Sequence, residues 1–289
     1  MRALRITGLV IFLLSSIAFL GFKQYKAYSK DNEGPEITYQ SDSISVSVNA
    51  SEQDLLQEVT AFDKVEGDVT ASIMIEKISK FTSPGKRTIT YAAFDSSNNI
   101  TKRERELVYT DYISPRYSLS QPLIFNVGDV DILKNLTVSD CIDGDLTSNI
   151  KYDEQDYTFG DFEGIYEMKL QVTNSAGDTA YLPVEVEFRY PSYEKSEFIP
   201  KILLKEYLVY CKIGEAFNAW SYLDKVLVDQ EGHTVQSSLT NGGRMISKGD
   251  ISLDSNVDMR QAGVYQVKYS MTTEDGYTGT TKLIVVVEE

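Results

Sequence analysis

The fold is decided by a two-part stretch, Val138-Ser-Asp-Cys-Ile-Asp-Gly-Asp-Leu-Thr-Ser-Asn-Ile150 followed by Gly164-Ile-Tyr-Glu-Met-Lys-Leu-Gln-Val-Thr-Asn-Ser-Ala-Gly177. Apolar residues occupy every other position of the second part, which is the pattern of a β-strand with one buried and one solvated face. Glycine, asparagine and serine bound this strand and indicate turns. The stretch therefore predicts antiparallel β-structure.

The same two-part pattern occurs three times along the chain. It is present upstream, in Thr60–Ile73 and Gly85–Asn99, and in a degraded and longer form downstream, in Val228–Leu239 and Gly263–Gly276. The first two copies are offset by about 80 residues, a fixed period that indicates an internal duplication. A unit of this size suits an Ig-like sandwich of seven short strands.

The repeats and their flanking segments predict an all-β chain: three tandem Ig-like β-sandwich domains after a single N-terminal transmembrane helix. The predicted parts are, in order, a cytoplasmic start at 1–5, a transmembrane signal anchor at 6–22, a stalk at 23–34, Ig-like repeats at 35–110 and 111–189, a linker at 190–200 and a divergent Ig-like domain at 201–289.

The second copy, Val-Ser-Asp-x-x-Asp-Gly-Asp-Leu-Thr-Ser-x-Ile followed by Gly-x-Tyr-x-x-x-x-x-Val-x-Asn-x-x-Gly, resembles the bacterial Ig-like repeat that also occurs in an insecticidal crystal protein, and it is similar to hyalin-type repeats. The resemblance is fair in the first copy, where Glu66 replaces the first Asp of Asp-Gly-Asp. In the third copy it is confined to the Gly-x-Tyr strand and the final turn. It implies tandem modules of a bacterial surface protein, which is a fold and a location rather than an activity.

The anchor prediction rests on Ile6–Phe22, which carries no charge. Its length is at the lower limit for a helix that spans a bilayer. A cleaved signal peptide is the alternative, but no small-residue cleavage site follows the apolar run directly. We therefore expect an uncleaved, single-pass anchor in the cell membrane. Lys23 and Lys26 blur the charge asymmetry, so the extracellular placement of the C-terminal region rests on the character of the repeats.

The composition excludes a nucleic-acid partner. The net charge is -15, and beyond the five cations of the first thirty residues the chain carries 23 cations against 43 acids. Such a surface repels polyanions. It suits either solubility, which we favour, or contact with divalent cations. Cys141 and Cys211 fall in different repeats and do not form a disulfide framework.

The acidic loops are the candidate metal site. Three carboxylates within six residues could supply hard oxygen ligands to Ca²⁺, but the spacing is not that of an EF-hand. The preferred alternative is a turn, in which Asp accepts local backbone hydrogen bonds and Gly supplies a positive φ. No other cofactor is predicted. The candidate ligands are Asp63, Glu66 and Asp68 in the first repeat and Asp140, Asp143 and Asp145 in the second.

Candidate recognition residues lie in the divergent third domain. Trp220 and Tyr222 form either a ligand anchor or, by preference, part of the core. The extra loop around Arg244, Met245 and Lys248 brings cations into an acidic chain, and rigid sandwiches commonly present binding loops. A terminal capping repeat is the alternative explanation for the divergence. The tyrosines of Gly-x-Tyr could form a carbohydrate platform, but packing at a sandwich corner is preferred.

No phosphate loop, dinucleotide fingerprint, zinc spacing or nucleophile elbow is present in the sequence, and no triad can be argued around His233. We therefore predict no enzymatic activity. The predicted function is a non-catalytic, membrane-anchored extracellular module for adhesion, in which two repeats act as spacer and the third recognises a protein or surface glycan. The alternative is an accessory subunit that docks on a membrane-bound polysaccharide-export or wall-synthesis complex.

Overall fold

The computed structural model describes residues 11–21, 23, 31–129, 131–154, 159–190, 197–228, 231–233 and 246–289. Strands dominate these ranges, so the prediction of an all-β fold is confirmed. The chain divides into two compact units, Met1–Tyr112 and Ile113–Glu289. The first unit contains one β-sandwich and the second contains two, and all three share the same strand order.

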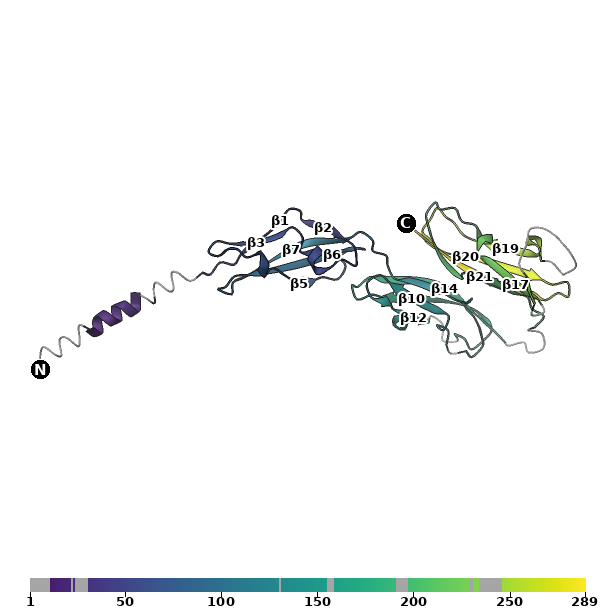
Figure 1. Cartoon of the computed structure of the whole chain (residues 1–289). Helices are drawn as coiled ribbons and strands as arrows, with labels where there is room; N and C mark the ends of the chain where they lie inside the picture. The colour runs from purple at the N-terminus through teal and green to yellow at the C-terminus, as the bar shows by residue number, and fades with distance from the viewer. Residues whose placement is uncertain are drawn as a thin grey trace. The chain divides into compact units, whose positions relative to one another are not determined.

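The first sandwich consists of a three-stranded sheet and a four-stranded sheet (Figure 1). The smaller sheet has the order β1 (Glu36–Tyr39), β3 (Val59–Asp63) and β4 (Gly67–Asp68). The larger has the order β2 (Ser43–Val46), β7 (Ile100–Tyr109), β6 (Lys86–Phe94) and β5 (Met74–Ile78). The short helices are α2 (Glu52–Leu55) and η1 (Thr70–Ser72). Strand β2 pairs in parallel with β7, while the other strand pairs are antiparallel.

The second sandwich repeats this arrangement. Its sheets are β8 (Arg116–Leu119), β10 (Leu136–Asp140) and β11 (Gly144–Asp145), and then β9 (Ile124–Asn126), β14 (Thr179–Arg189), β13 (Gly164–Thr173) and β12 (Lys151–Glu154). The helix η2 spans Thr147–Asn149. Strand β9 pairs in parallel with β14, in the same way as β2 with β7.

The third sandwich keeps the topology despite its degraded sequence. Its sheets are β15 (Lys201–Leu204), β17 (Leu223–Val228) and β18 (Glu231–His233), and then β16 (Leu208–Lys212), β21 (Thr278–Glu288), β20 (Gly263–Thr272) and β19 (Ile251–Ser255). The short helices are η3 (Ala219–Tyr222) and η4 (Lys248–Asp250). The fold is maintained because the alternating strand pattern survives where the Asp-Gly-Asp turn does not.

The buried residues follow the period of two that the sequence predicts. Burial alternates along β3 and β10, so that Val59 and Ala61 face the first core and Leu136 and Val138 face the second. The turn after each strand needs glycine, since Gly67 has a φ of 85° and Gly144 a φ of 76°. Only glycine adopts this left-handed conformation without steric cost.

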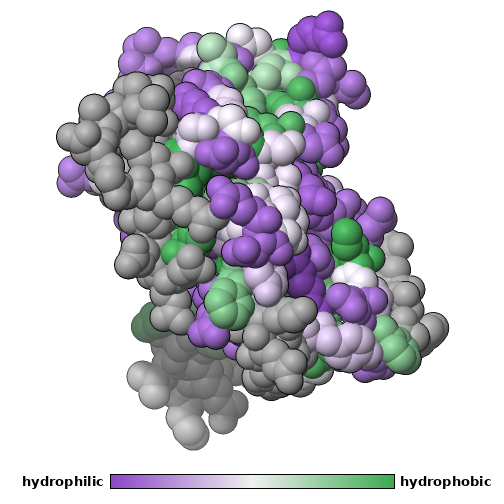
Figure 2. Space-filling model, turned by 90° about the vertical axis from the view of Figure 1, so that its right-hand side faces the viewer, coloured by the Kyte–Doolittle hydropathy of each residue, from purple (hydrophilic) through white to green (hydrophobic). Residues whose placement is uncertain are grey.

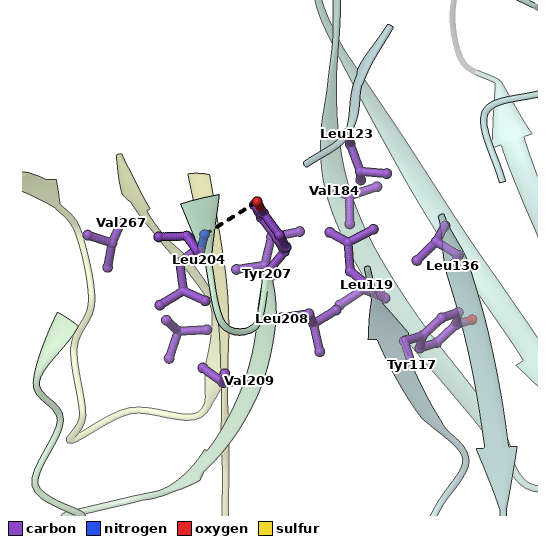
Figure 3. Packing of buried hydrophobic residues seen from close by; sticks show 14 of the residues in the cluster. Tyr117, Leu119, Leu123, Leu136, Val184, Leu204, Tyr207, Leu208, Val209 and Val267 are labelled. Carbon is purple, nitrogen blue, oxygen red and sulfur yellow. Dashed lines mark hydrogen bonds between the residues drawn. The ribbon is translucent and has the colours of Figure 1, made fainter. Parts of the chain in front are cut away.

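The two sandwiches of the second unit share one hydrophobic cluster. Leu208 of the third sandwich lies beside Leu119 of the second, and Leu123 and Val184 of the second sandwich belong to the same cluster (Figure 3). Ion pairs flank this apolar centre, because Arg116 contacts Glu288 and Lys282 contacts Glu185. The second and third sandwiches are therefore packed against each other, which the expectation of a simple tandem arrangement did not include.

Residues 11–21 and 23 are helical and precede the first sandwich in the chain. In the part of the chain that the structure describes, no helix combines the length and the apolar character needed to cross a membrane. The predicted anchor at 6–22 and the linker at 190–200 lie partly outside the described residues, and the cytoplasmic start at 1–5 lies wholly outside them. Hydrophilic residues cover much of the molecular face in Figure 2, with hydrophobic ones among them.

Candidate metal centre

Three carboxylates meet at one end of the first sandwich: Asp31, Asp63 and Asp95. Asp63 is the last residue of β3, Asp95 begins the β6–β7 turn, and Asp31 lies in the segment that leads into β1. One oxygen from each lies within 4.8 Å of the others. Oxygens that ligate one Ca²⁺ at its usual bond length are separated by at most about 5 Å, so the three can share an ion.

Local hydrogen bonds hold the two buried members of this cluster. Oδ1 of Asp63 accepts from the backbone N–H groups of Val65 and Glu66, at 2.8 and 2.9 Å. The Asp95 carboxylate accepts from the backbone N–H and the side-chain amide of Asn99, at 2.8 and 2.7 Å. These bonds aim both carboxylates before any ligand arrives, which lowers the cost of binding an ion.

The segment before β1 is attached to the sandwich by the same asparagine. The Asn99 amide also donates to the backbone carbonyls of Asp31 and Glu33. A Cβ on Gly34 would lie 2.6 Å from Oγ1 of Thr101, so this close approach to β7 favours glycine. Asp31 is thus placed at the cluster by contacts that do not involve its own carboxylate.

The electrostatics of the cluster call for a cation. Asp63 and Asp95 are only 2% and 4% exposed. Burial raises the pKa of Asp95, but the hydrogen bonds from Asn99 outweigh burial, so its pKa lies below the ordinary value and the group is ionised at neutral pH. Oδ2 of Asp31 is buried without a hydrogen-bond partner among the described residues. Neighbouring buried carboxylates with unused oxygens are costly unless a positive charge compensates them.

The second sandwich replaces this arrangement with a direct hydrogen bond. Asp140 ends β10 as Asp63 ends β3, and Asn174 begins the β13–β14 turn as Asp95 begins the β6–β7 turn. The Asn174 amide donates to Oδ2 of Asp140 at 3.1 Å. An amide donor satisfies the buried carboxylate, and the need for a cation is removed.

The third sandwich loses the charges at both positions. Val228 ends β17 and Thr273 begins the β20–β21 turn, and both side chains are buried. The three sandwiches therefore form a series at equivalent positions, from two carboxylates through a carboxylate and an amide to an apolar residue and a hydroxyl. The series makes the first sandwich the distinctive member.

The other predicted metal ligands have separate structural roles. Glu66 accepts from the backbone and hydroxyl of Ser96, and Asp143 accepts from the same groups of Ser175, so each joins two turns of its sandwich. Among the described residues, only Asp63 of the six predicted ligands belongs to the three-carboxylate group.

Asp68 and Asp145 fill the third position of the Asp-Gly-Asp pattern. Each accepts a hydrogen bond from the backbone N–H two residues later, Thr70 and Thr147 respectively, at 2.9 Å. Hydrogen bonds from the side chains of these threonines, and then the backbone bonds, lower the pKa of both carboxyls. This is the local turn geometry that the Asp and Gly spacing indicates.

Three of the predicted recognition residues of the third sandwich, Trp220, Tyr222 and Lys248, lie among the described residues. Trp220 and Tyr222 are half-buried and pack against the core, and Tyr222 stacks on Phe217. Nζ of Lys248 lies 5.2 Å from the Trp220 ring centroid. Arg244 and Met245 lie outside the described residues.

The tyrosines of Gly-x-Tyr pack at sandwich corners. The hydroxyl of Tyr166 donates to the carbonyl of Phe162, and that of Tyr265 donates to the carbonyl of Gln261. Tyr166 also makes edge-to-face contacts with Phe159 and the buried Phe188. Cys141 and Cys211 carry free thiols.

Sequence reasoning missed Asp31 and Asp95, which looked like part of a stalk and part of a turn. A signal was present: Asp31 stands four residues before Pro35, and Asp111 stands four residues before Pro115. Acidic residues at the same position ahead of the first two repeats marked the entry segment as part of the module.

The chain is thus a protein of Ig-like β-sandwiches with an oxygen-lined candidate cation site in the first. No protein family model matches it. It is similar to an uncharacterised 81.3 kDa protein of Acholeplasma phage L2, with 24% identity over 188 residues. That match covers 64% of this chain and 22% of the phage protein, so the chain spans about a fifth of this relative's length.

Among solved structures, the chain is similar to the M60 catalytic domain with the CBM51-1 and CBM51-2 domains of Clostridium perfringens ZmpB, at 14% identity and a TM-score of 0.23, covering 88% of this chain and 30% of that one. It is also similar to mouse cadherin-23 EC22–24, at 12% identity and a TM-score of 0.20, covering 89% and 99%. Nothing about function follows from similarities of this size.

Proposed function

We propose that this chain is a non-catalytic surface module whose first sandwich binds Ca²⁺ through Asp31, Asp63 and Asp95. The observation that supports the proposal is the three-carboxylate cluster, with its two buried members and an oxygen of Asp31 that has no hydrogen-bond partner among the described residues. In this function, the sandwiches hold a recognition surface for a protein or glycan at a distance from the membrane.

The donor set favours calcium over other metals. All three side chains offer hard carboxylate oxygens, which suit Ca²⁺, whereas zinc sites are built mainly from thiolate and imidazole ligands. Backbone carbonyls and water complete the six to eight ligands of a typical calcium site. Mg²⁺ demands a more regular and smaller shell and retains several waters, so it is the weaker candidate.

A bound ion would fasten the entry segment to the sandwich. Asp31 comes from the segment before β1, while Asp63 and Asp95 belong to the sandwich body. One ion shared among them restricts the joint between them, because releasing the segment also means losing a ligand. A stiffened joint suits a module that presents a surface at a distance.

The location is part of the same proposal. The uncharged run Ile6–Phe22 supports an anchor in the cell membrane, and the character of the repeats supports a place outside for the sandwiches. Amino-terminal sequencing of the membrane-extracted protein tests it, and a mature chain that begins after Phe22 contradicts it. Docking on a polysaccharide-export or wall-synthesis complex stays the alternative function.

The calcium site is tested by thermal unfolding of residues 23–289 with Ca²⁺ or with chelator. Calcium at a hundredfold excess over its Kd should raise the midpoint of the first unit by on the order of 10 °C. The single tryptophan, Trp220, lies in the second unit and supplies an internal control. Circular dichroism should therefore show a calcium-dependent transition that tryptophan fluorescence does not follow. Identical circular dichroism curves with and without calcium contradict the proposal.

A further inference from the structure

The outer face of the four-stranded sheet in the second sandwich carries an exposed aromatic ring. Tyr181 of β14 is 54% exposed and stands opposite Gln171 of β13, which in turn stands opposite Lys151 of β12 (β12 and β14 in Figure 1). The ring borders a shallow groove of about 530 Å³ at the end of the sheet near η2. The groove is lined by polar side chains, including Ser148, Asn149 and Thr179.

A lysine side chain lies over the ring beside the groove. Nζ of Lys169 lies 4.1 Å from the ring centroid of Tyr181 and covers one face of the ring. Lys169 does not line the groove, whereas Tyr181 does. The ring is thus supported on the side away from the groove, and its groove side is available for stacking.

Equivalent positions in the other sandwiches are used for structural contacts. Counting from the start of the hairpin's second strand, Tyr181 corresponds to Lys102 in β7 and to Thr280 in β21. Lys102 forms an ion pair with Glu76, and Thr280 accepts a hydrogen bond from Arg189. The second sandwich is therefore the one in which this position presents an aromatic ring to solvent.

The chemistry of the groove matches an uncharged sugar chain. A pyranose ring has an apolar C–H face that stacks on an aromatic ring, and hydroxyls around its edge that donate and accept hydrogen bonds. Amides and hydroxyls satisfy both roles, and Gln171, Asn149 and Thr179 supply them. Among the described residues that line the groove, none is a carboxylate and one, Lys151, is a cation. The net charge of -15 disfavours polyanions at this surface.

We propose that this groove binds an uncharged glycan whose pyranose ring stacks on Tyr181, with Gln171 and Lys151 hydrogen-bonding its hydroxyls. The inference rests on the proposed recognition role and gives it a ligand class and a place. It moves recognition from the third sandwich to the second. It is independent of the calcium site, because the groove lies in the second unit and the carboxylate cluster in the first.

The test is an array of neutral and acidic glycans probed with residues 23–289, followed by titration calorimetry with the best neutral oligosaccharide. Binding should be selective for neutral glycans and unchanged by chelator. Tyr181→Ala should weaken binding about tenfold, whereas Tyr181→Phe keeps the ring and should retain it. Lys102→Ala, at the matching position of the first sandwich, is the control and should bind as the parent does.

Two results overturn the inference. One is an array on which no neutral glycan binds in a Tyr181-dependent manner. The other is binding that Tyr181→Ala and Lys102→Ala reduce equally, which places the glycan elsewhere. The unfolding midpoint of Tyr181→Ala, followed through Trp220 fluorescence, verifies that the variant is folded. Glycan binding without a calcium-dependent rise in the unfolding midpoint contradicts the calcium site alone. A calcium-dependent rise in the midpoint without glycan binding contradicts the groove alone.

Discussion

The side-chain amide of Asn174 donates to Oδ2 of Asp140 across 3.1 Å, where the equivalent positions of the first sandwich hold two carboxylates, Asp95 and Asp63. The Asn174 amide satisfies the Asp140 carboxylate with a hydrogen bond. The Asp95 carboxylate has no such donor to offer Asp63, so that pair needs a cation. A buried carboxylate is stable beside a donor and costly beside a second carboxylate. Asn174→Asp gives the second sandwich the two carboxylates of the first, and Asp95→Asn gives the first sandwich the amide of the second.

Asn174→Asp should destabilise the second unit at neutral pH by about 2–3 kcal/mol, because it removes a buried donor and adds a like charge beside Asp140. Urea unfolding followed by Trp220 fluorescence measures the change. Asn174→Ala is the matched control, since it removes the donor without adding a charge, and it should cost less. An equal loss in both variants means that the added charge has no effect.

Asp95→Asn should convert the first sandwich to the arrangement of the second. We expect the variant to unfold at a lower temperature than the parent in chelator, because the Asp95 carboxylate accepts from the backbone N–H and the side-chain amide of Asn99 and an amide cannot replace both charge-assisted bonds. We also expect the calcium-dependent rise in the midpoint to disappear. Circular dichroism of both proteins, with and without calcium, measures the two effects. Retention of the full calcium response in Asp95→Asn contradicts the ligand assignment.

Asp68 and Asp145 predict how stability changes with acid. The hydrogen bonds from Thr70 and Thr147 lower the pKa of these carboxyls in the folded state below the ordinary value of 3.8. A carboxyl whose pKa is lowered by folding contributes stability that is complete above its unfolded pKa and is lost as the pH falls through the folded pKa. In chelator, the unfolding midpoint should therefore decrease once the pH drops below about 4. The double variant Asp68→Asn/Asp145→Asn should show a shallower fall, and an unchanged slope contradicts the assignment.

Leu208 predicts the strength of the contact between the second and third sandwiches. It is 6% exposed and lies beside Leu119 across the contact (Figure 3). Leu208→Ala should destabilise the second unit by about 2–4 kcal/mol, since a buried side chain is replaced by a cavity. Trp220 fluorescence in urea measures this loss. Ile213→Ala, which removes a 42% exposed side chain just after β16, is the control and should have an effect below about 0.5 kcal/mol.

Tyr210 predicts a polar contribution to the same contact. Its hydroxyl accepts a hydrogen bond from the backbone N–H of Tyr117 at 2.9 Å, and Arg116 lies over its ring. Tyr210→Phe keeps the ring and removes the acceptor, so we expect a loss of about 1–2 kcal/mol. Urea unfolding of the second unit tests this value. A variant as stable as the parent means that the Tyr117 N–H finds another acceptor.

The outcome for the acidic loops shows how far local sequence reaches. The Asp and Gly spacing indicated turns, and Asp68 and Asp145 do make the expected short-range hydrogen bonds with Thr70 and Thr147. The hydrogen bond between Glu66 and Ser96 joins two turns that lie far apart in the sequence, and the spacing of residues within either turn did not predict it. Trp220 and Tyr222 lie against the core, which is the position that the sequence analysis preferred for them over a ligand anchor.

The sequence by itself determined the all-β class, the alternation of each strand and the turns, because these depend on residues within a few positions of one another. Only the tertiary structure decided which carboxylates meet and which sandwiches pack together. Asp31, Asp63 and Asp95 are brought to one place by strand pairing across the sandwich, and Leu208 meets Leu119 through the packing of two sandwiches. Both relationships depend on long-range geometry, and a residue's immediate neighbours in the chain carry no signal of it.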